Sequence, residues 1–350
     1  AGTSTAALGF GGNPPNAAKE TESWNGTNWT AVTNMNVGKD NTPGGAGTNT
    51  KALAFGGEGP PNLTATEEWN TGVAVGAWST GGSLNTARDQ LAGAGTQTSA
   101  LAFGGRPDTG KTESYNGTSW TEVNDLITAR NDLGGVGVSN TAALAFGGDL
   151  NPGTNTELWN GTNWTAVNAL QTAGGKIGAS AGIQTSALAI GGERPLAVSP
   201  TVNVESWNGT NWTEVNNTNT VKDLAAGAGA DNTAAIAFGG NVSPKANTEL
   251  WNGTNWTEVN DLNTGRDNLA SAGTSTAALA FGGSAPPVTG KTEIWNGTNW
   301  TETTDLTIAR ASLGGAGTNT AALAFGGTPP FLTATEEWND PGTITKTLTT

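Results

Sequence analysis

The 350-residue sequence predicts an all-β protein built from repeated four-stranded units, and three observations support this prediction. A short apolar run ends in a Gly-Gly pair eight times, at steps of 43 to 48 residues. Within these runs, large and small side chains alternate with a period of two, which is the period of a strand. Glycine accounts for 53 residues, about twice its ordinary usage. The second glycines of the pairs are Gly12, Gly57, Gly105, Gly148, Gly192, Gly240, Gly283 and Gly327.

Residues 130–167 illustrate the strands of one unit. In the second strand, Leu144 and Phe146 alternate with alanines, so one face is large and the other is small. Such sheets can stack large face onto small face, and a first strand of small residues suits a crowded axis. Four-stranded units stacked about an axis form a β-propeller. The four predicted strands are 133–138, 141–146, 156–159 and 163–167.

A linear solenoid is the alternative architecture, and it would require atypical polar caps at both ends. The last unit does depart from the repeat in its final residues, so the solenoid stays open as an alternative. We favour a β-propeller with eight blades, one for each Gly-Gly pair, and seven blades as the alternative count. No stretch between units resembles a linker, so we expect a single propeller domain of about eight repeats over residues 1–350.

Tryptophans recur at two positions of the unit, on the predicted third and fourth strands. The segment 160–163, Asn-Gly-Thr-Asn, has turn-forming residues and would place Trp159 opposite Trp164. A buried Trp removes ~150–250 Å² from water, which is worth roughly 4–6 kcal/mol. We therefore expect the 14 tryptophans in the core rather than on a sugar-binding surface. The repeated Asn-x-Thr pattern matches a glycosylation acceptor, but a hairpin turn accounts for it.

The composition argues against several classes of function. The net charge of −14 opposes binding to nucleic acid or to an anionic membrane. No apolar run approaches the ~20 residues of a membrane-spanning helix. The sequence contains no Cys and no His, which removes thiolate sites, the commonest metal ligand and the Ser-His-Asp triad. We expect no catalytic residues, no metal, no cofactor, no nucleic-acid partner and no membrane insertion.

A glutamate recurs in every unit on the third strand, and a cation recurs at nearly fixed phase ahead of the first strand. One ion pair for each blade or blade junction explains both. Paired carboxylates for glycoside hydrolysis or a carboxylate ring for a cation are the alternatives, but catalysis requires an asymmetric pair. The glutamates are Glu22, Glu67, Glu113, Glu157, Glu205, Glu249, Glu293 and Glu336. The cations are Lys39, Arg88, Arg130, Lys222, Arg266 and Arg310, with Lys176 slightly shifted.

The pattern Arg130, Gly147-Gly148, Trp159, Trp164 resembles the kelch repeat over nearly the whole chain. The Tyr that is usual in that family is Trp in seven units and remains only as Tyr115. The resemblance implies a propeller. The sequence of the unit is also similar, more loosely, to kelch-like repeat arrays in predicted virion and tail proteins of marine bacteriophages. Galactose oxidase shares the kelch-like propeller, but its copper-radical site requires His, Tyr and Cys ligands, so that activity does not carry over.

The units differ most between the Gly-Gly pair and the next Glu. These loops leave equivalent points of every blade, so they gather at one rim, and most contain Pro, which lowers the ordering cost of binding. Neutral drift of surface loops is the alternative explanation. The candidate binding residues in these loops are Lys19, Arg106, Asp108, Lys111, Asp149, Arg194, Lys245 and Lys291.

The expected function is therefore a non-enzymatic binding or structural propeller, displayed on a virion (tail- or fibre-associated) or on an extracellular surface. Its expected partners are a protein or glycan receptor on a cell surface, or neighbouring virion subunits. One alternative is a carboxylate-based glycan hydrolase. It would use acidic residues that do not recur at the same position in every unit, such as Asp108, Asp149 and Glu193. The other is an intracellular protein-interaction scaffold, the usual kelch role in eukaryotes.

Overall fold

The structure is a computed structural model of the whole chain, and it divides into two compact units. The first comprises Ala1–Val75 with Thr343–Thr350, and the second comprises Gly76–Gly342, where the sequence predicted one domain over residues 1–350. The residues that it describes are 2–4, 6–10, 20–31, 44–47, 51–55, 66–70, 76–107, 110–149, 153–172, 176–194, 197–243 and 245–340. Within these ranges no helix has the length and apolarity that a membrane crossing requires.

The second unit contains six sheets, each of four antiparallel strands. The first sheet consists of β9 (Ala92–Thr96), β10 (Ser99–Phe103), β11 (Thr112–Tyr115) and β12 (Trp120–Val123). The second consists of β13 (Gly134–Ser139), β14 (Ala142–Phe146), β15 (Thr156–Trp159) and β16 (Trp164–Val167). The third consists of β17 (Ala179–Ile183), β18 (Ser186–Arg194), β19 (Ala197–Trp207) and β20 (Trp212–Val215). The fourth sheet consists of β21 (Ala226–Asp231), β22 (Ala234–Phe238), β23 (Thr248–Trp251) and β24 (Trp256–Glu258). The fifth consists of β25 (Ala270–Thr274), β26 (Ala277–Phe281), β27 (Thr292–Trp295) and β28 (Trp300–Glu302). The sixth consists of β29 (Gly314–Gly317), β30 (Ala321–Phe325), β31 (Thr335–Asn339) and β8 (Ala77–Gly81).

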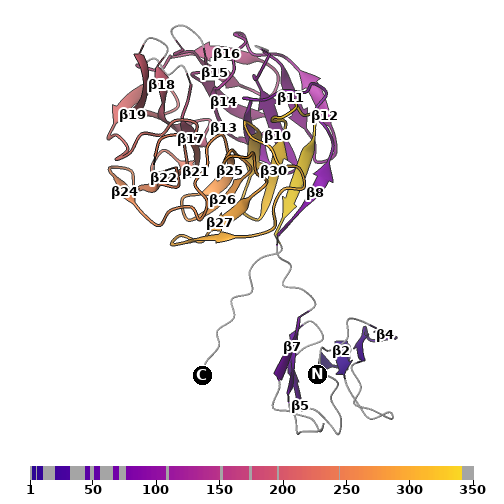
Figure 1. Cartoon of the computed structure of the whole chain (residues 1–350). Coiled ribbons are helices and arrows are strands. Elements are labelled where there is room, and N and C mark those ends of the chain that lie inside the picture. The colour runs from indigo at the N-terminus through magenta and orange to yellow at the C-terminus, as the bar shows by residue number, and fades with distance from the viewer. Residues whose placement is uncertain are drawn as a thin grey trace. The chain divides into compact units, whose positions relative to one another are not determined.

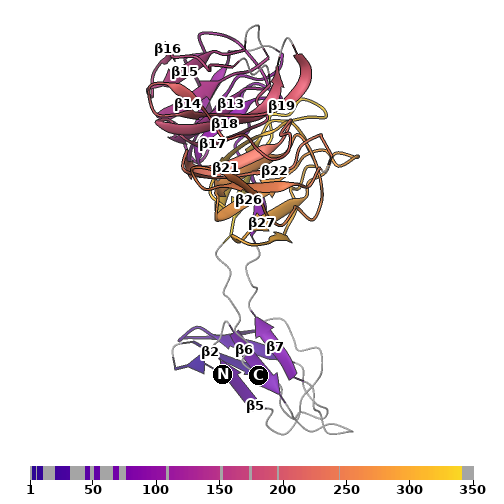
Figure 2. The ribbon, with the colours of Figure 1, turned by 90° about the vertical axis from the view of Figure 1, so that its left-hand side faces the viewer.

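These six sheets close into a ring, so the predicted all-β propeller is confirmed. The first strand of each sheet contacts the first strand of the sheets on both sides, and β29 contacts β9. Figure 1 shows the blades arranged around a common centre, and Figure 2 shows the same unit turned by 90°. The favoured count of eight blades is wrong for this ring, which has six. Seven sheets of the described chain have four strands, but the seventh belongs to the first unit.

The blade count differs from the prediction because β8 does not pair with β7, the preceding strand of its own repeat. It pairs with β31 at the other end of the chain, with Trp78 opposite Trp338. The sequence permits this exchange because β7 and β31 have the same sequence, TEEWN. The ring therefore closes through a blade that both ends of the unit share.

The described residues of the first unit form two further antiparallel sheets. One has four strands in the order of the chain, as in the ring, and the other has three. They are β1 (Gly2–Thr3), β2 (Ala6–Phe10), β3 (Thr21–Trp24) and β4 (Trp29–Ala31); and β5 (Gly44–Gly47), β6 (Lys51–Phe55) and β7 (Thr66–Asn70).

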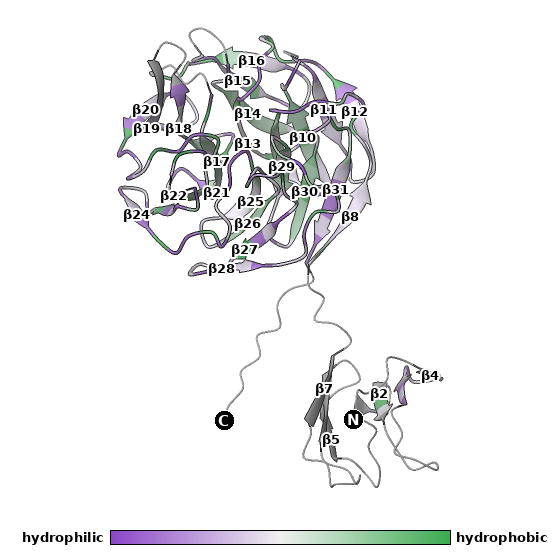
Figure 3. Ribbon diagram, in the orientation of Figure 1, coloured by the Kyte–Doolittle hydropathy of each residue, from purple (hydrophilic) through white to green (hydrophobic). Residues whose placement is uncertain are grey.

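Neighbouring blades pack large face onto small face, as the alternation predicts. Leu279 and Phe281 of β26 lie in one buried cluster with Ala322 and Ala324 of β30, and Trp78 completes it. All four strand residues are fully buried. Figure 3 shows hydrophobic β10, β14 and β30 within the ring. The core is therefore a set of equivalent layers between blades rather than one central cluster.

Five of the six layers also contain a hydrogen bond between a tryptophan and a threonine of neighbouring blades. The indole Nε1 of Trp300 on β28 donates to Thr248 Oγ1 of the preceding blade at 3.2 Å, in a buried position. One layer differs, because Val204 takes the place of the threonine and Trp256 Nε1 has no partner within the described part of the chain. The five bonds join Trp78 to Thr292, Trp120 to Thr335, Trp164 to Thr112, Trp212 to Thr156 and Trp300 to Thr248.

The repeated Gly-Gly pair lets two chain segments approach each other closely. Gly282 and Gly283 have φ of 65° and 107°, in the left-handed region that side chains avoid. A Cβ at Gly282 would lie 2.7 Å from the carbonyl oxygen of Arg310. Glycine is therefore required where the chain leaves the second strand beside the next blade.

We expect Val204→Thr to stabilise the protein by about 1 kcal/mol, because it supplies the acceptor that Trp256 Nε1 lacks. The free energy of unfolding in urea measures the effect. Thr248→Val is the matched control, since it removes the acceptor of Trp300 and should destabilise the protein by about 1–3 kcal/mol. A loss of stability on Val204→Thr would contradict this account of the layer.

Candidate binding face

The antiparallel order of strands brings two kinds of segment to one end of every blade. The loop between the second and third strands leaves there, and so does the connection from the fourth strand to the next blade. We call this end the loop face, and the opposite end, which carries both tight hairpins, the hairpin face. The loops of the loop face are 104–111, 147–155, 239–247, 282–291 and 326–334, as far as they are described, and at 191–203 the extended ends of β18 and β19 take the place of a loop.

A belt of backbone hydrogen bonds surrounds the centre of the loop face. Each belt residue lies shortly before the first strand of its blade, and five bonds of 2.8–3.0 Å join the six residues from blade to blade. Asp132 N–H, for example, donates to the carbonyl oxygen of Gln90, and Gln90 N–H donates to that of Ser312. Five of the residues have φ of 51° to 53°. The belt consists of Gln90, Asp132, Ile177, Leu224, Asn268 and Ser312.

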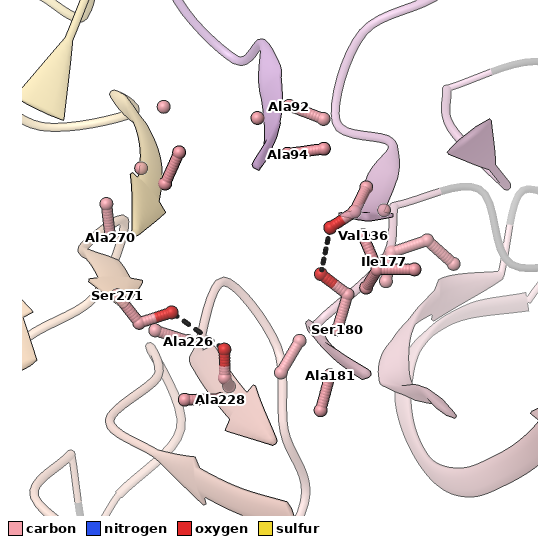
Figure 4. Close-up of a pocket in the computed structure, with 18 of the residues that line it drawn as sticks. Ala92, Ala94, Val136, Ile177, Ser180, Ala181, Ala226, Ala228, Ala270 and Ser271 are labelled. Carbon is pink, nitrogen blue, oxygen red and sulfur yellow. Dashed lines mark hydrogen bonds between the residues drawn. The ribbon is translucent and has the colours of Figure 1, made fainter. Parts of the chain in front are cut away.

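A channel of about 220 Å³ runs between the first strands of the blades, with the belt residues among its lining. Its wall is formed mostly by glycine and alanine, and Figure 4 shows small side chains directed toward it. Ser180 Oγ donates to the carbonyl oxygen of Gly135 at 3.2 Å, and Ser271 Oγ donates to that of Gly227 at 2.7 Å. Both hydroxyls thus bind a neighbouring blade.

Asp132 is the belt residue with an unusual charge state. Burial raises the pKa of its carboxyl to about 7 from an ordinary 3.8. Lys176 and Arg106 oppose the rise, whereas Asp149 and Asp89 add to it. This carboxyl therefore changes its charge near neutral pH, at the mouth of the channel.

Two of the predicted loop cations lie close to the belt and are paired there. Arg106 Nη2 is 2.7 Å from Asp89 Oδ2, and Lys245 Nζ is 2.9 Å from Asp267 Oδ2. Asp89 and Asp267 directly precede the belt residues Gln90 and Asn268. These cations therefore fasten a loop to the centre of the face.

Two other predicted cations lie at the outer side of their blades. Lys291 Nζ is 2.6 Å from Glu302 on the fourth strand of its blade, and Lys111 forms the same pair with Glu122. Both lysines and both glutamates are exposed, so each pair contributes little stability. The structure therefore does not bring all the predicted cations together in one patch.

The remaining predicted residues are dispersed. Asp149 is exposed on the loop face, and its backbone N–H donates to the carbonyl oxygen of Asn131. Arg194 is the last residue of β18 and lies opposite Ala197 in the ladder. Lys19 and Asp108 lie outside the described residues.

One blade breaks the repeat on this face. Its cation, Lys176, pairs with Glu193 at 3.0 Å instead of with the buried Glu205. The strands β18 and β19 of this blade span nine and eleven residues, against four or five in the other blades of the ring, so they form a long hairpin on the loop face. The shifted position of Lys176 was the sequence signal for this departure.

The repeated glutamates are structural in the ring. Glu293 lies 3.3 Å from Arg266 Nη2 and accepts hydrogen bonds from Asn263 and Thr264 of the incoming connection. Burial lowers the pKa of the Arg266 guanidinium, and Glu293 opposes that shift. The predicted ion pair is confirmed in five of the six blades of the ring: Arg88–Glu113, Arg130–Glu157, Lys222–Glu249, Arg266–Glu293 and Arg310–Glu336.

The loop face also exposes large apolar side chains that are not among the predicted binding residues. Phe331 is 48% exposed in one loop, and Val242 is exposed in another. Ile127 and Ile308 are exposed on two connections between blades. On the hairpin face of the ring, Val138 is the exposed counterpart among the described residues. An apolar residue inside a variable loop was the signal available in the sequence.

Comparison with known proteins supports the fold and gives no information on function. One similar solved structure is that of YjhT, with a TM-score of 0.59 and 11% sequence identity, over 73% of this chain and 95% of that chain. At this identity the likeness shows the fold alone. No family model matches the sequence, and no curated protein does. In the described part of the chain, no three acids lie close enough together to hold a metal ion.

We expect Asp132→Asn to remove a pH dependence of stability. Because the pKa of Asp132 is higher in the folded than in the unfolded chain, the free energy of unfolding falls as pH rises from about 4 to 7. The variant should gain about 1–3 kcal/mol at pH 8 and almost nothing at pH 4. Asn268 already occupies the equivalent position, so the backbone tolerates asparagine. Equal effects at both pH values in urea unfolding would contradict this assignment.

We expect Glu293→Gln to cost about 3–5 kcal/mol of stability, because it leaves the buried charge of Arg266 without its partner. Glu205→Gln is the matched control. Glu205 accepts N–H bonds from Gln171 and Thr172 at 2.8 Å, and no cation pairs with it in the described residues. Its loss should be about 1–2 kcal/mol. Similar losses in the two variants, measured by thermal unfolding, would contradict the role of the ion pair.

Proposed function

We propose that the protein is a non-enzymatic binding propeller, whose loop face engages a protein or glycan receptor or a neighbouring subunit. The exposed apolar side chains of that face carry the proposal. Four of the large apolar residues exposed on the ring, Ile127, Val242, Ile308 and Phe331, belong to loops or connections of this one face. Exposed apolar side chains that share one face can be covered by a single partner, and this is why we propose the loop face as the interaction site.

The scaffold beneath the face suits such a role. Belt bonds join neighbouring blades, and ion pairs such as that of Arg106 with Asp89 fasten the loops. A loop that is held in place before binding loses less conformational entropy on binding. The loops differ in length and sequence, whereas the blades beneath them repeat, and this division between a rigid frame and variable loops is common in binding proteins.

The long hairpin of β18 and β19 gives the face a distinct side. It is the longest pair of strands in the described chain, and it lies in the blade whose cation has moved to the surface. A partner of low symmetry would be oriented by this one blade, although the other blades are nearly equivalent. We propose that the hairpin sets the orientation of the partner.

We propose a virion or an extracellular surface as the setting. The support is the resemblance of the repeats to kelch-like arrays of phage tail proteins, together with an acidic composition of net charge −14. Within that setting, a cell-surface receptor and a neighbouring particle subunit are both suitable partners. The measurement below separates them.

The test is binding of the whole chain to a glycan array, to envelope fractions of candidate host cells and to particle subunits. Phe331→Ser should weaken binding to the partner at least tenfold. Val138→Ser is the matched control, because Val138 is exposed to a similar degree, 51% against 48%, but lies on the hairpin face. No binding to any of the three classes, or equal losses in both variants, would contradict the proposal.

A further inference from the structure

The four-stranded sheet of the first unit has the internal structure of a ring blade. The rings of Trp24 and Trp29 are 5.5 Å apart, against 5.4 Å for Trp295 and Trp300. Trp24 Nε1 on β3 donates to the carbonyl oxygen of Ser4, between β1 and β2 of the same sheet, at 3.0 Å, and Trp295 donates in the same way to Ser275. This sheet is therefore built to stack on both sides, as the blades of the ring do.

Only one of its two faces is covered. Leu8, on the large face, is 2% exposed. On the opposite face, Ala7, Gly9 and Trp24 are partly exposed, and Trp29 is 50% exposed. We call this opposite face, made of these four residues, the open face. In the ring, equivalent residues are buried, and no ring tryptophan of the fourth strand exceeds 6% exposure.

The ring shows which surface fits the open face. Each ring face of this kind meets the Leu/Phe face of the preceding blade, as Trp300 does, whose ring lies 4.6 Å from that of Phe238. All six large faces of the ring, including the two that carry isoleucine, are already covered by a following blade. The partner of Trp29 must therefore lie outside the ring.

The sheet of β5, β6 and β7 carries the matching sequence. In β6, Leu53 and Phe55 hold the strand positions that Leu279 and Phe281 hold in β26. The backbone register agrees, because Phe55 lies opposite Thr66 as Phe281 lies opposite Thr292. In the ring, that Phe and Thr are the pair that receives the tryptophan of the next blade.

Six blades complete one turn in the ring, so each blade accounts for a sixth of a turn. Two sheets stacked in the same way would cover a third of a turn, so the outer faces of one chain's two sheets could not meet each other. Three chains would supply six sheets. Such a head-to-tail contact closes when its rotation closes. We propose that the open face binds the β5–β7 sheet of a second copy, and that three copies of the first unit complete a six-bladed ring.

The mass of the whole chain in solution, measured by light scattering after size exclusion, tests the proposal. We expect three times 35.1 kDa. Trp29→Glu should reduce the mass to that of one chain. Val138→Glu is the matched control, since Val138 is 51% exposed but lies on the ring, and it should leave the trimer intact. A monomeric or dimeric wild type, or a trimer that survives Trp29→Glu, would overturn the proposal.

A cross-linking experiment identifies the contact without removing Trp29. The chain has no cysteine, so a pair can be introduced at Ala7→Cys and Leu53→Cys. In the ring, the equivalent Ala322 and Leu279 share one cluster between blades. Oxidation should link three chains in the double variant and none in either single variant. A cross-link within one chain, seen as a monomer of altered mobility, would overturn the proposal. Cooperative unfolding of each variant checks that it has folded.

Discussion

The stacking of a large sheet face on a small one is the interaction on which the structure depends. Within each layer, two large apolar residues of one blade, mostly leucine and phenylalanine, fill the space left by alanines of the next, as Phe281 does against Ala324. A small sheet with two apolar faces is not stable alone, because each face must be buried. The ring satisfies this requirement for all its sheets at once, since closure leaves no outermost blade. Equivalent layers also explain why the chain repeats so closely, because each blade has to fit the same neighbour on either side.

Polar groups inside these layers are few and mostly satisfied. The tryptophan of the fourth strand combines an apolar ring with one donor, and a threonine of the preceding blade accepts from it. The repeated glutamate binds the incoming connection and a buried cation together, so it joins the segment between blades to the third strand. One blade departs from both patterns. Val204 stands there in place of the threonine acceptor, and the cation Lys176 pairs with Glu193 instead of with the repeated glutamate, Glu205. That blade also carries the long hairpin, so local regularity is lost where the loop face is most distinct.

Much of the fold follows from the sequence, because period and residue size are local properties. The alternation of Leu144 and Phe146 with alanine gave the strand and its stacking mode, and the recurrence of Glu with a cation gave the buried pairs. The number of blades is not a local property. It depends on whether β8 pairs with β7 or with β31, and these two strands are identical in sequence. The repeat therefore predicts the structure of a blade but not the number of blades in the ring.

The candidate face was only partly predictable for a related reason. The sequence located the loops, and Arg106 and Lys245 do lie beside the belt. It could not assign their partners, because Asp89 and Asp267 come from a different part of the repeat that the strand ladder brings alongside. The raised pKa of Asp132 results from burial by the assembled blades, which no residue pattern records. Charges that are close in space but distant in the repeat require the three-dimensional arrangement.

The shared blade has a consequence for how the chain is made. Strand β8 emerges early from the ribosome, whereas β31, its partner, is among the last segments of the ring to be synthesised. Until then the growing chain exposes an unpaired strand edge and an uncovered apolar face, the features that favour association of nascent chains. The ring can therefore close only after β31 has been synthesised, and a chain that stops short of β31 leaves β8 without its partner strand.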